Sequence, residues 1–260
     1  VARALLAAQT LGLDRLDAQL LLGHLLQRPR AWLIAHDDGL LPDDLATRFT
    51  AECQRRMAGE PLAYLTGERE FHGLRLQVSP AVLVPRPDTE TLVDWALSCC
   101  VRMQADRPLH LLDLGTGSGA IALALAKGLQ DRRPAAHITA TDLSPDALAV
   151  AAANAQRLGL AIEFSQGAWW AAVPAERRFD LIVSNPPYVA GADAHLGQGD
   201  LRFEPPRALT DGSADGLASI RVIVAGAPQH LNPGGWLLLE HGYDQAAACS
   251  DLLLKAGLQN

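Results

Sequence analysis

The stretch that decides the fold lies at residues 109–120 and reads LHLLDLGTGSGA. Residues 109–114 form a short apolar run that is typical of a buried strand, and residues 120–128 continue with the pattern of a helix. The loop between them is rich in glycine, which allows a tight turn and lets the backbone approach a ligand closely. Its residues are Gly115, Thr116, Gly117, Ser118 and Gly119. This order of strand, loop and helix predicts a parallel sheet that binds a ligand at its carboxyl edge.

Downstream of that loop the sequence keeps alternating between strand and helix. Ser144 caps a helix that begins at Pro145 and closes at Gly159, and a long helix is expected over residues 216–230. Further strands are expected at residues 138–141, 161–164, 179–184 and 235–240. The alternation predicts an α/β fold, a Rossmann-like parallel sheet with helices on both faces.

The first part of the chain has a different texture and predicts a small helical bundle over residues 1–75. Apolar residues recur at helical spacing over residues 16–26, and Pro29 ends that run. A second helix is expected to begin at Pro42, because proline suits a first turn, and to stop at Gly59. No strand is expected in this region.

The sequence therefore divides into three parts. Residues 1–75 carry no chemical motif, so we expect this all-helical domain to recognise a substrate protein rather than to catalyse a reaction. Residues 76–88 alternate in polarity and then break on prolines, which we interpret as a short β-hairpin linker. Residues 89–260 then form the domain that contains the sheet.

Composition limits the class of protein. The chain has 260 residues, of which 49% are hydrophobic and 20% charged, and this excludes a disordered protein. Its apolar runs are too short to span a membrane, and its start does not predict a signal peptide. The spacing of the four cysteines and of the histidines predicts no metal site, and the cysteines are expected to be thiols in a reducing cytoplasm. The net charge of −7 argues against a protein that coats nucleic acid.

The glycine loop alone leaves the identity of the cofactor open. Gly115, Gly117 and Ala120 also fit the dinucleotide pattern, and Asp142 at the end of the second strand could bind the ribose hydroxyls of NAD as well as those of another nucleoside. Asp113, just before the glycines, favours S-adenosylmethionine. A carboxylate there can orient the loop or meet the ammonium group of that cofactor, whereas it would sit awkwardly near a pyrophosphate.

The strand expected at residues 179–184 delivers the motif Asn185-Pro186-Pro187-Tyr188 to the same edge. Two adjacent prolines hold the backbone rigid and lack N–H groups, so neighbouring carbonyls stay available as acceptors. With the side-chain carbonyl of Asn185 they form two acceptors that converge on a planar NH₂ group, and Tyr188 offers a flat wall for stacking. Such a site suits methylation of an amide or exocyclic amine, because holding both N–H bonds aims a delocalised lone pair at an activated methyl group.

Together the glycine loop and the Asn-Pro-Pro-Tyr motif resemble the class I methyltransferases that modify planar nitrogens. The helical N-terminal region and three further segments resemble the bacterial release factor glutamine methyltransferases, and the likeness runs over essentially the whole chain. These segments are Val84-Pro85-Arg86-Pro87-Asp88-Thr89-Glu90, Gly199-Asp200-Leu201-Arg202-Phe203-Glu204-Pro205 and Leu239-Glu240-His241-Gly242. The resemblance implies transfer of a methyl group from S-adenosyl-L-methionine to the side-chain nitrogen N5 of the glutamine in the Gly-Gly-Gln motif of class 1 peptide chain release factors. The product would be S-adenosyl-L-homocysteine, and the enzyme would be cytoplasmic.

The resemblance also implies a role for individual residues. Residues 115–119 would hold the methionine part of the cofactor, Asp142 its ribose and Trp169 its adenine. Asn185 would contact both the cofactor and the substrate. The substrate glutamine would be held by Asn185, Pro186, Pro187 and Tyr188, of which Asn185, Pro186 and Tyr188 carry the catalysis. Residues 85–90 are expected to line the same pocket.

Two features depart from the family pattern. Ala168 stands where similar proteins usually carry an acid before the tryptophan, so a hydrogen bond to the adenine amine would be lost or made by the backbone. The chain also ends at Gln259-Asn260 after a helix, where the family continues into a final pair of strands. The last edge of the sheet is therefore expected to be missing.

Other functions remain open on the sequence alone. A glutamine methyltransferase of a ribosomal protein would share the core chemistry, and an adenine-N6 methyltransferase acting on nucleic acid would share the Asn-Pro-Pro-Tyr motif. A non-catalytic cofactor-binding module and an NAD enzyme are further alternatives, although no hydride-transfer residues support the latter. Glu240 and His241 are candidates for a general base only by their position.

Overall fold

A computed structural model describes residues 1–103, 107–130 and 136–259. The chain divides into two compact units, of which the first comprises Val1–Glu68 with Gly197–Phe203, and the second Arg69–Leu196 with Glu204–Asn260. Asn260, the last residue of the domain expected over residues 89–260, lies outside the described residues. No helix within the described ranges is both long and apolar enough to cross a membrane.

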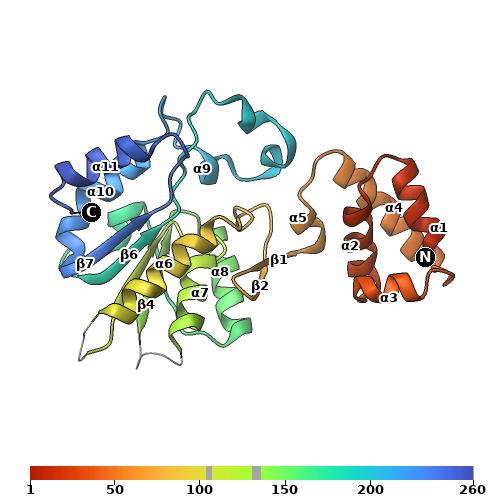
Figure 1. The fold of residues 1–260 in the computed structure, drawn as a ribbon, viewed down its shortest axis with the longest axis horizontal. Helices are drawn as coiled ribbons and strands as arrows, with labels where there is room; N and C mark the ends of the chain where they lie inside the picture. Colours follow the sequence, from red (N-terminus) through yellow and green to blue (C-terminus); the bar gives the residue numbers. More distant parts are fainter. Residues whose placement is uncertain (104–106, 131–135, 260) are drawn as a thin grey trace. The chain divides into compact units, whose positions relative to one another are not determined.

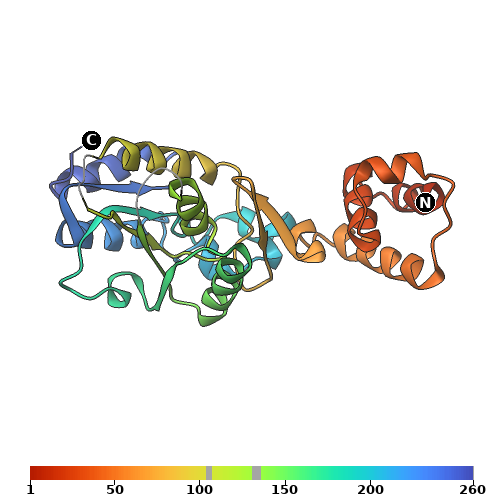
Figure 2. The ribbon, with the colours of Figure 1, turned by 90° about the horizontal axis from the view of Figure 1, so that it is seen from below.

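The first unit is a bundle of short helices around a core that includes Leu21, Leu22 and Phe49. Figure 1 and Figure 2 show its helices, coloured red to orange, grouped together in one bundle. The helices are α1 (Ala2–Thr10), α2 (Arg15–Leu26), α3 (Arg30–Ala35), α4 (Asp43–Met57) and α5 (Leu62–Thr66). The helices predicted over residues 16–26 and from Pro42 to Gly59 are confirmed as α2 and α4.

A segment distant in the sequence completes this unit. It contains the 3₁₀ helix η3 (Gly199–Phe203), which follows another 3₁₀ helix, η2 (Ala194–Gly197). The Arg56 guanidinium donates from Nη1 to Asp200 Oδ1 at 2.8 Å and from Nε to Asp17 Oδ2 at 2.7 Å. One arginine of α4 thereby ties this segment to α2, a long-range pairing that the local sequence pattern does not reveal.

The second unit is built on a sheet of five parallel strands in the order β5-β4-β3-β6-β7. The strands are β3 (His110–Leu114), β4 (His137–Asp142), β5 (Glu163–Gln166), β6 (Phe179–Ser184) and β7 (Leu231–Leu239). The chain first builds outward from β3 to β5 and then returns to place β6 on the other side of β3. This reversal creates a topological switch point between the carboxyl ends of β3 and β6.

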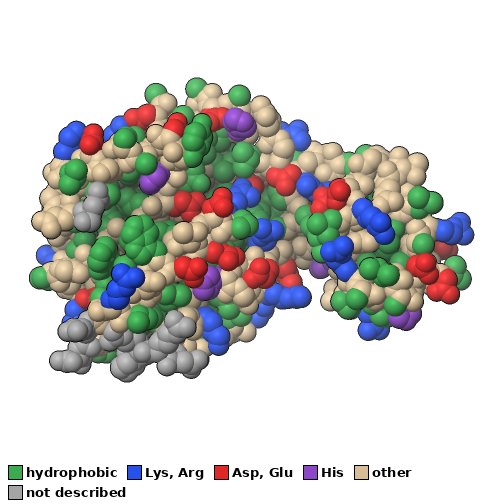
Figure 3. Space-filling view, in the orientation of Figure 1, with side chains coloured by type: hydrophobic (Ala, Val, Ile, Leu, Met, Phe, Trp, Pro, Cys, Tyr) green, Lys and Arg blue, Asp and Glu red, His purple; other side chains and the backbone are tan. Residues whose placement is uncertain are grey.

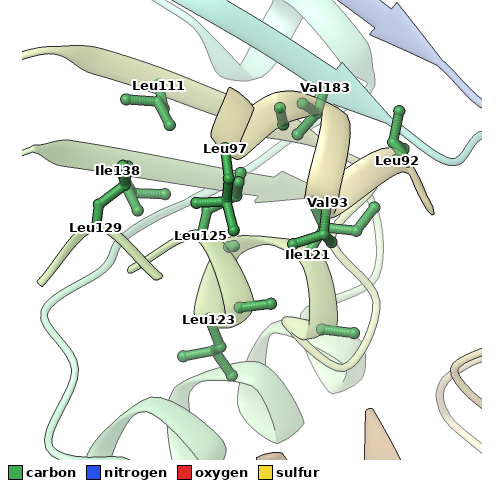
Figure 4. Packing of buried hydrophobic residues seen from close by; sticks show 14 of the residues in the cluster. Leu92, Val93, Leu97, Leu111, Ile121, Leu123, Leu125, Leu129, Ile138 and Val183 are labelled. Carbon is green, nitrogen blue, oxygen red and sulfur yellow. The ribbon is translucent and has the colours of Figure 1, made fainter. Parts of the chain in front are cut away.

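Helices cover both faces of this sheet, as predicted. Because side chains alternate along a strand, Leu111 of β3 packs in one core cluster and Leu112 in another. Figure 4 shows the first cluster, where Val93 and Leu97 meet Ile121 and other residues over the sheet. This cluster includes residues of three helices, α6 (Thr89–Arg102), α7 (Ala120–Leu129) and α8 (Pro145–Leu158). Two helices pack on the other face, α10 (Ala218–His230) and α11 (Ala246–Lys255). The short helix α9 (Pro206–Leu209) precedes α10.

Local capping signals are reproduced closely at α8. Ser144 Oγ accepts a hydrogen bond from the Ala147 N–H at 3.2 Å, Pro145 is the first helical residue, and Gly159 ends the helix with a left-handed φ of 65°. Helix α6 was not predicted from the sequence. Its N-cap residue Asp88 makes no side-chain capping bond, so the usual start signal is not used there.

The hairpin prediction is wrong in its position. The β-hairpin does not span residues 76–88 but consists of β1 (Glu68–Phe71) and β2 (Leu74–Gln77), so the expectation that residues 1–75 contain only helices is wrong as well. The turn residues His72 and Gly73 have φ of 49° and 76°, the left-handed pair that a two-residue hairpin turn requires. Asn-Gly or Asp-Gly is the stronger sequence signal for such a turn, and the prolines after residue 79 cannot donate ladder hydrogen bonds.

Two strand boundaries also differ from the prediction. The third strand of the sheet, expected at residues 161–164, is Glu163–Gln166, because its register follows from pairing with β4, where Asp142 faces Gln166. The fifth, expected at residues 235–240, begins earlier at Leu231, which pairs with Phe179 across an irregularity in the register. In both cases the pairing partner, rather than the local apolar pattern, sets the end of the strand.

The amino edge of the sheet is held by a carboxylate on β6. Asp180 accepts hydrogen bonds from the Arg107 guanidinium at 2.6 and 2.8 Å, from the His110 N–H at 2.9 Å and from Asn232 Nδ2 at 2.7 Å. Burial opposes ionisation of this group, but these donors outweigh it and lower the pKa of Asp180 below its ordinary value. Asp180 therefore joins the starts of β3, β6 and β7.

Replacement of this carboxylate tests its contribution to stability. Asp180→Asn is expected to lower the free energy of unfolding at pH 7 by about 1–3 kcal/mol, since buried donors lose a charged acceptor. A lowered pKa in the folded state stabilises the protein above the unfolded pKa of about 4 and loses its effect as pH falls further. The difference between wild type and variant in urea unfolding should therefore shrink towards pH 3. Asp251→Asn, at an exposed position of α11, should change stability little at either pH.

Candidate active site

The predicted site residues converge on the carboxyl edge of the sheet. The glycine loop follows β3, Asp142 ends β4, Trp169 follows β5 and Asn185 follows β6. A hydrogen bond from Ser184 Oγ to the Leu114 carbonyl oxygen, at 2.6 Å, joins the ends of β3 and β6. The structure therefore brings the two motifs together at the switch point of the sheet, where open α/β folds bind ligands.

The glycine loop is shaped by backbone conformation. Gly115, Gly117 and Gly119 all have left-handed φ, of 75°, 54° and 83°. The N–H groups of Gly115 and Thr116 both donate to the Thr141 carbonyl oxygen, at 2.9 and 2.8 Å, which ties the loop to β4. A Cβ atom on Gly117 would meet no heavy atom within 4 Å, whereas one on Gly119 would lie 3.2 Å from Ala151 Cβ. Gly117 thus borders open space, and Gly119 serves the packing of α7 against α8.

Asp113 holds this loop from within the core. Its side chain is fully buried, and Oδ2 accepts hydrogen bonds from Thr116 Oγ1 at 2.7 Å and from the Ala122 N–H at 3.2 Å. Oδ1 has no hydrogen-bond partner among the described residues. Burial raises the pKa of Asp113 to about 7, against the lowering effect of these two donors. The first of its two predicted roles, orientation of the loop, is confirmed.

Asp142 lies beside the same loop. Its Oδ2 accepts from the Gly117 N–H and its Oδ1 from the Ser144 N–H, each at 2.9 Å. These two bonds fix the orientation of the carboxylate, and each oxygen keeps acceptor capacity for a further donor. Asp142 can therefore bind hydroxyl groups without rearrangement.

Trp169 covers the start of the glycine loop. It has a left-handed φ of 49°, which is uncommon for a residue other than glycine, and it opens the 3₁₀ helix η1 (Trp169–Ala172). Its Cζ3 atom lies 3.4 Å from the position that a Cβ on Gly115 would occupy. The neighbouring Trp170 faces elsewhere, because its indole stacks on His230 with ring centroids 4.6 Å apart. Of the two tryptophans, Trp169 is thus the one at the loop.

The Asn185 side chain is held by a residue from a different part of the chain. Its Nδ2 donates to Thr89 Oγ1 at 3.0 Å, and Thr89 is the buried first residue of α6. With Nδ2 bound to Thr89, the side-chain carbonyl Oδ1 remains as the acceptor of this amide. Thr89 belongs to residues 85–90, which were expected to line the substrate pocket; that role stays a prediction.

The segment around Thr89 is itself fixed by a buried ion pair. Arg86 Nη2 lies 2.5 Å from Glu204 Oε1, and the Val84 N–H donates to Glu204 Oε2 at 3.0 Å. The Glu204 side chain has no solvent exposure. The Glu204 carboxylate thus holds the backbone of Val84 and the side chain of Arg86 in place.

Tyr188 is held at both its side chain and its backbone. Its hydroxyl donates to Glu240 Oε1 at 3.1 Å, and its carbonyl oxygen accepts from Gln245 Nε2 at 2.9 Å. Burial, together with the nearby Glu240 carboxylate, raises the pKa of Tyr188 to about 12, so it stays a neutral donor. Glu240 Oε2 is buried without a hydrogen-bond partner in the described part of the chain. His241 turns its Nδ1 to the Gly242 carbonyl oxygen at 2.8 Å.

Sequence reasoning missed two residues that shape this site. Gln245 joins three loops, because it also donates to the Asp215 carbonyl oxygen at 2.9 Å and accepts from the Gly242 N–H at 2.8 Å. Thr89 was only part of a quoted segment. Thr89 contacts Asn185, and Gln245 contacts Tyr188 and Asp215, across long separations in the sequence, so no local spacing could have predicted these contacts. In the structure both residues stand out as polar residues that are buried.

This arrangement defines a class of protein. A parallel sheet of this strand order, a glycine loop after its first strand, an acid after the second and an Asn-Pro-Pro-Tyr motif after the fourth make a class I methyltransferase. In agreement, residues 1–67 match the PrmC N-terminal domain family and residues 96–200 match the methyltransferase small domain family.

Curated relatives identify the family. The chain is 54% identical to the release factor glutamine methyltransferase of Bordetella pertussis, over 95% of this chain and 89% of the relative. It is 52% identical to the protein of the same name from Xylella fastidiosa, over 98% and 90%. The chain belongs to the release factor glutamine methyltransferase family, which confirms the resemblance seen in the sequence. A solved methyltransferase from Pyrococcus furiosus shares the fold, with 21% identity, a TM-score of 0.52 and coverage of 80% of this chain and 88% of that one.

Close packing at Tyr188 yields a test of the site's rigidity. Gly216 has a φ of 67°, and a Cβ there would lie 2.8 Å from the Tyr188 carbonyl carbon. Gly216→Ala should therefore displace the backbone of Tyr188, destabilise the protein and lower methyl transfer about tenfold or more. Gly159→Ala is the matched control, because it has a φ of 65° and open space around it. It should cost only the conformational strain of about 1 kcal/mol and leave transfer intact. Equal effects of the two substitutions on transfer would contradict this reading.

Proposed function

We propose that this chain transfers a methyl group from S-adenosyl-L-methionine to N5 of the glutamine in the Gly-Gly-Gln motif of class 1 peptide chain release factors. The observation that carries this proposal is the Asn185 side chain, whose Nδ2 is bound to Thr89 and whose Oδ1 is left as an acceptor beside two prolines. The names of the curated relatives supply the substrate class.

The residues present fit this cofactor. Gly117 borders open space, and Asp113 orients this loop from within the core. Asp142 is oriented by two backbone N–H groups and retains capacity for ribose hydroxyls. Trp169, against Gly115, offers an aromatic face for adenine. When bound, S-adenosylmethionine supplies an electrophilic methyl group on a sulfonium centre. Gly115, Thr116, Gly117, Ser118 and Gly119 would hold its methionine part.

The substrate amide needs help to react, because its nitrogen lone pair is delocalised. Asn185 Oδ1 and the carbonyl of Pro186 would accept its two N–H bonds and so turn the lone pair towards the methyl group. Pro187 keeps that backbone rigid, and the Tyr188 ring would flank the planar amide. Fixed orientation can contribute several of the roughly 7–11 kcal/mol available from positioning, and the oriented carbonyls stabilise the positive charge that develops on nitrogen. After transfer, the nitrogen loses one proton to water.

The partner and the compartment belong to the same proposal. The helical unit would recognise the release factor, and the reaction would take place in the cytoplasm, without a membrane and without direct binding of nucleic acid. The net charge of −7 supports the last point. So does Figure 3, in which the Lys and Arg side chains of the face in view are scattered among acidic ones.

A labelling experiment tests the activity. The protein is incubated with S-adenosylmethionine labelled in its methyl group and with a purified class 1 release factor, and the label is located by peptide mass spectrometry. We expect one methyl group on the glutamine of Gly-Gly-Gln and none on a release factor with that glutamine replaced by alanine. Label on a ribosomal protein or on adenine of nucleic acid, offered in parallel reactions, would redirect the assignment. Cofactor binding without any labelled product would indicate a non-catalytic module.

The role of Asn185 has its own test. Asn185→Ala is expected to lower the turnover number by about 100- to 1,000-fold, because one of the two amide acceptors is lost. Affinity for the cofactor, measured by calorimetry, should change no more than about threefold. Asn232→Ala removes the same side chain at the opposite edge of the sheet and should keep normal turnover in the folded protein. Near-normal turnover of Asn185→Ala would remove Asn185 from the reaction.

A further inference from the structure

An asparagine side chain can accept a hydrogen bond from the NH₂ group of a substrate amide in one orientation only. Its oxygen accepts a hydrogen bond and its nitrogen donates two, and the two ends have nearly the same size. If the Asn185 amide were turned over, it would present its NH₂ group to the NH₂ group of a glutamine, and two donors would face each other. Some neighbouring group must therefore select the orientation in which Oδ1 faces the substrate.

Thr89 is the neighbour in contact with this amide. Its Oγ1 accepts a hydrogen bond from Asn185 Nδ2 at 3.0 Å. Among the described residues, the Asn185 side chain makes this one hydrogen bond. Thr89 is 4% exposed, so bulk water does not compete for the amide from that side. The backbone N–H of Thr89 donates to the Arg86 carbonyl oxygen at 3.2 Å.

The hydroxyl is carried by a rigid part of the fold. Thr89 opens α6, whose residues Val93 and Leu97 are buried in the main core cluster (Figure 4). The chain just before it is held by the Glu204 carboxylate, through Arg86 and the Val84 N–H. A β-branched side chain also has a restricted χ1. The position of Oγ1 is thus set by packing that does not depend on Asn185.

We propose that Thr89 is a positioning residue for methyl transfer: its hydroxyl accepts a hydrogen bond from Asn185 Nδ2 and thereby directs Asn185 Oδ1 at the substrate amide. This inference rests on the proposed function. Thr89 touches neither reacting atom and acts through Asn185. With Nδ2 bound to Thr89, Oδ1 is the end of the Asn185 amide that can accept from an NH₂ group of the substrate.

Three variants test this role. Thr89→Val keeps the shape of the side chain but removes the acceptor, and it should lower the single-turnover rate of methyl transfer by about 10- to 100-fold. Thr89→Ser keeps the hydroxyl and should restore the rate to within about threefold of wild type. Thr139→Val makes the same exchange at another buried position, on β4, and should leave the rate unchanged. Cofactor affinity by calorimetry and unfolding by urea should be alike for all three.

A double-mutant cycle separates positioning from general packing. If Thr89 acts through Asn185, then Thr89→Val should add less than about twofold to the defect of Asn185→Ala, since the amide to be oriented is already gone. A full additional loss in that background would overturn the inference and indicate a structural role. So would a Thr89→Val enzyme with the wild-type rate, or a failure of Thr89→Ser to restore it.

The control with wild-type protein keeps this inference distinct from the proposed function. If wild type labels no glutamine, the proposed function fails. If wild type labels the Gly-Gly-Gln glutamine and the Thr89 variants do not follow the expected pattern, the proposed function stands and only the role of Thr89 is lost.

Discussion

Parallel pairing of β3 with β6 is the constraint on which the site depends. It sets Asp113 opposite Val183, and the bond from Ser184 Oγ to the Leu114 carbonyl oxygen extends the contact to the strand ends. The loop after β3 and the motif after β6 are separated by more than sixty residues in the sequence, yet both leave the sheet at neighbouring points. A cofactor held by the first loop would therefore lie next to a substrate held by the second, with no further device needed to bring them together.

Rigidity is then added from outside the motif. Asn185 is held by Thr89 of α6, the Tyr188 hydroxyl by Glu240 after β7, and the Tyr188 carbonyl by Gln245. Thr89 comes from α6, whereas Glu240 and Gln245 both lie in the segment between β7 and α11. A reaction that depends on orientation, with no strong nucleophile of its own, needs this kind of support, because small displacements of the acceptors cost rate steeply.

The sequence predicted local features well and long-range ones poorly. The strands β3, β4 and β6, the cap at Ser144 and the helix end at Gly159 follow from side-chain periodicity and backbone preference within a few residues. The hairpin was misplaced because its His72-Gly73 turn carries a weak signal, and prolines downstream resembled a stronger one. The limits of β5 and β7 were wrong because pairing with a neighbouring strand sets them.

The sequence by itself determined the class of fold, the glycine loop, the acid at Asp142 and the acceptor motif from Asn185 to Tyr188, because each depends on neighbours a few positions away. Only the tertiary structure decided which way the Asn185 amide faces, that Asp113 is buried with one oxygen lacking a partner among the described residues, and that Gln245 joins three loops. These features depend on contacts between residues tens of positions apart. Such contacts form only when the chain has folded and water has been removed from between them.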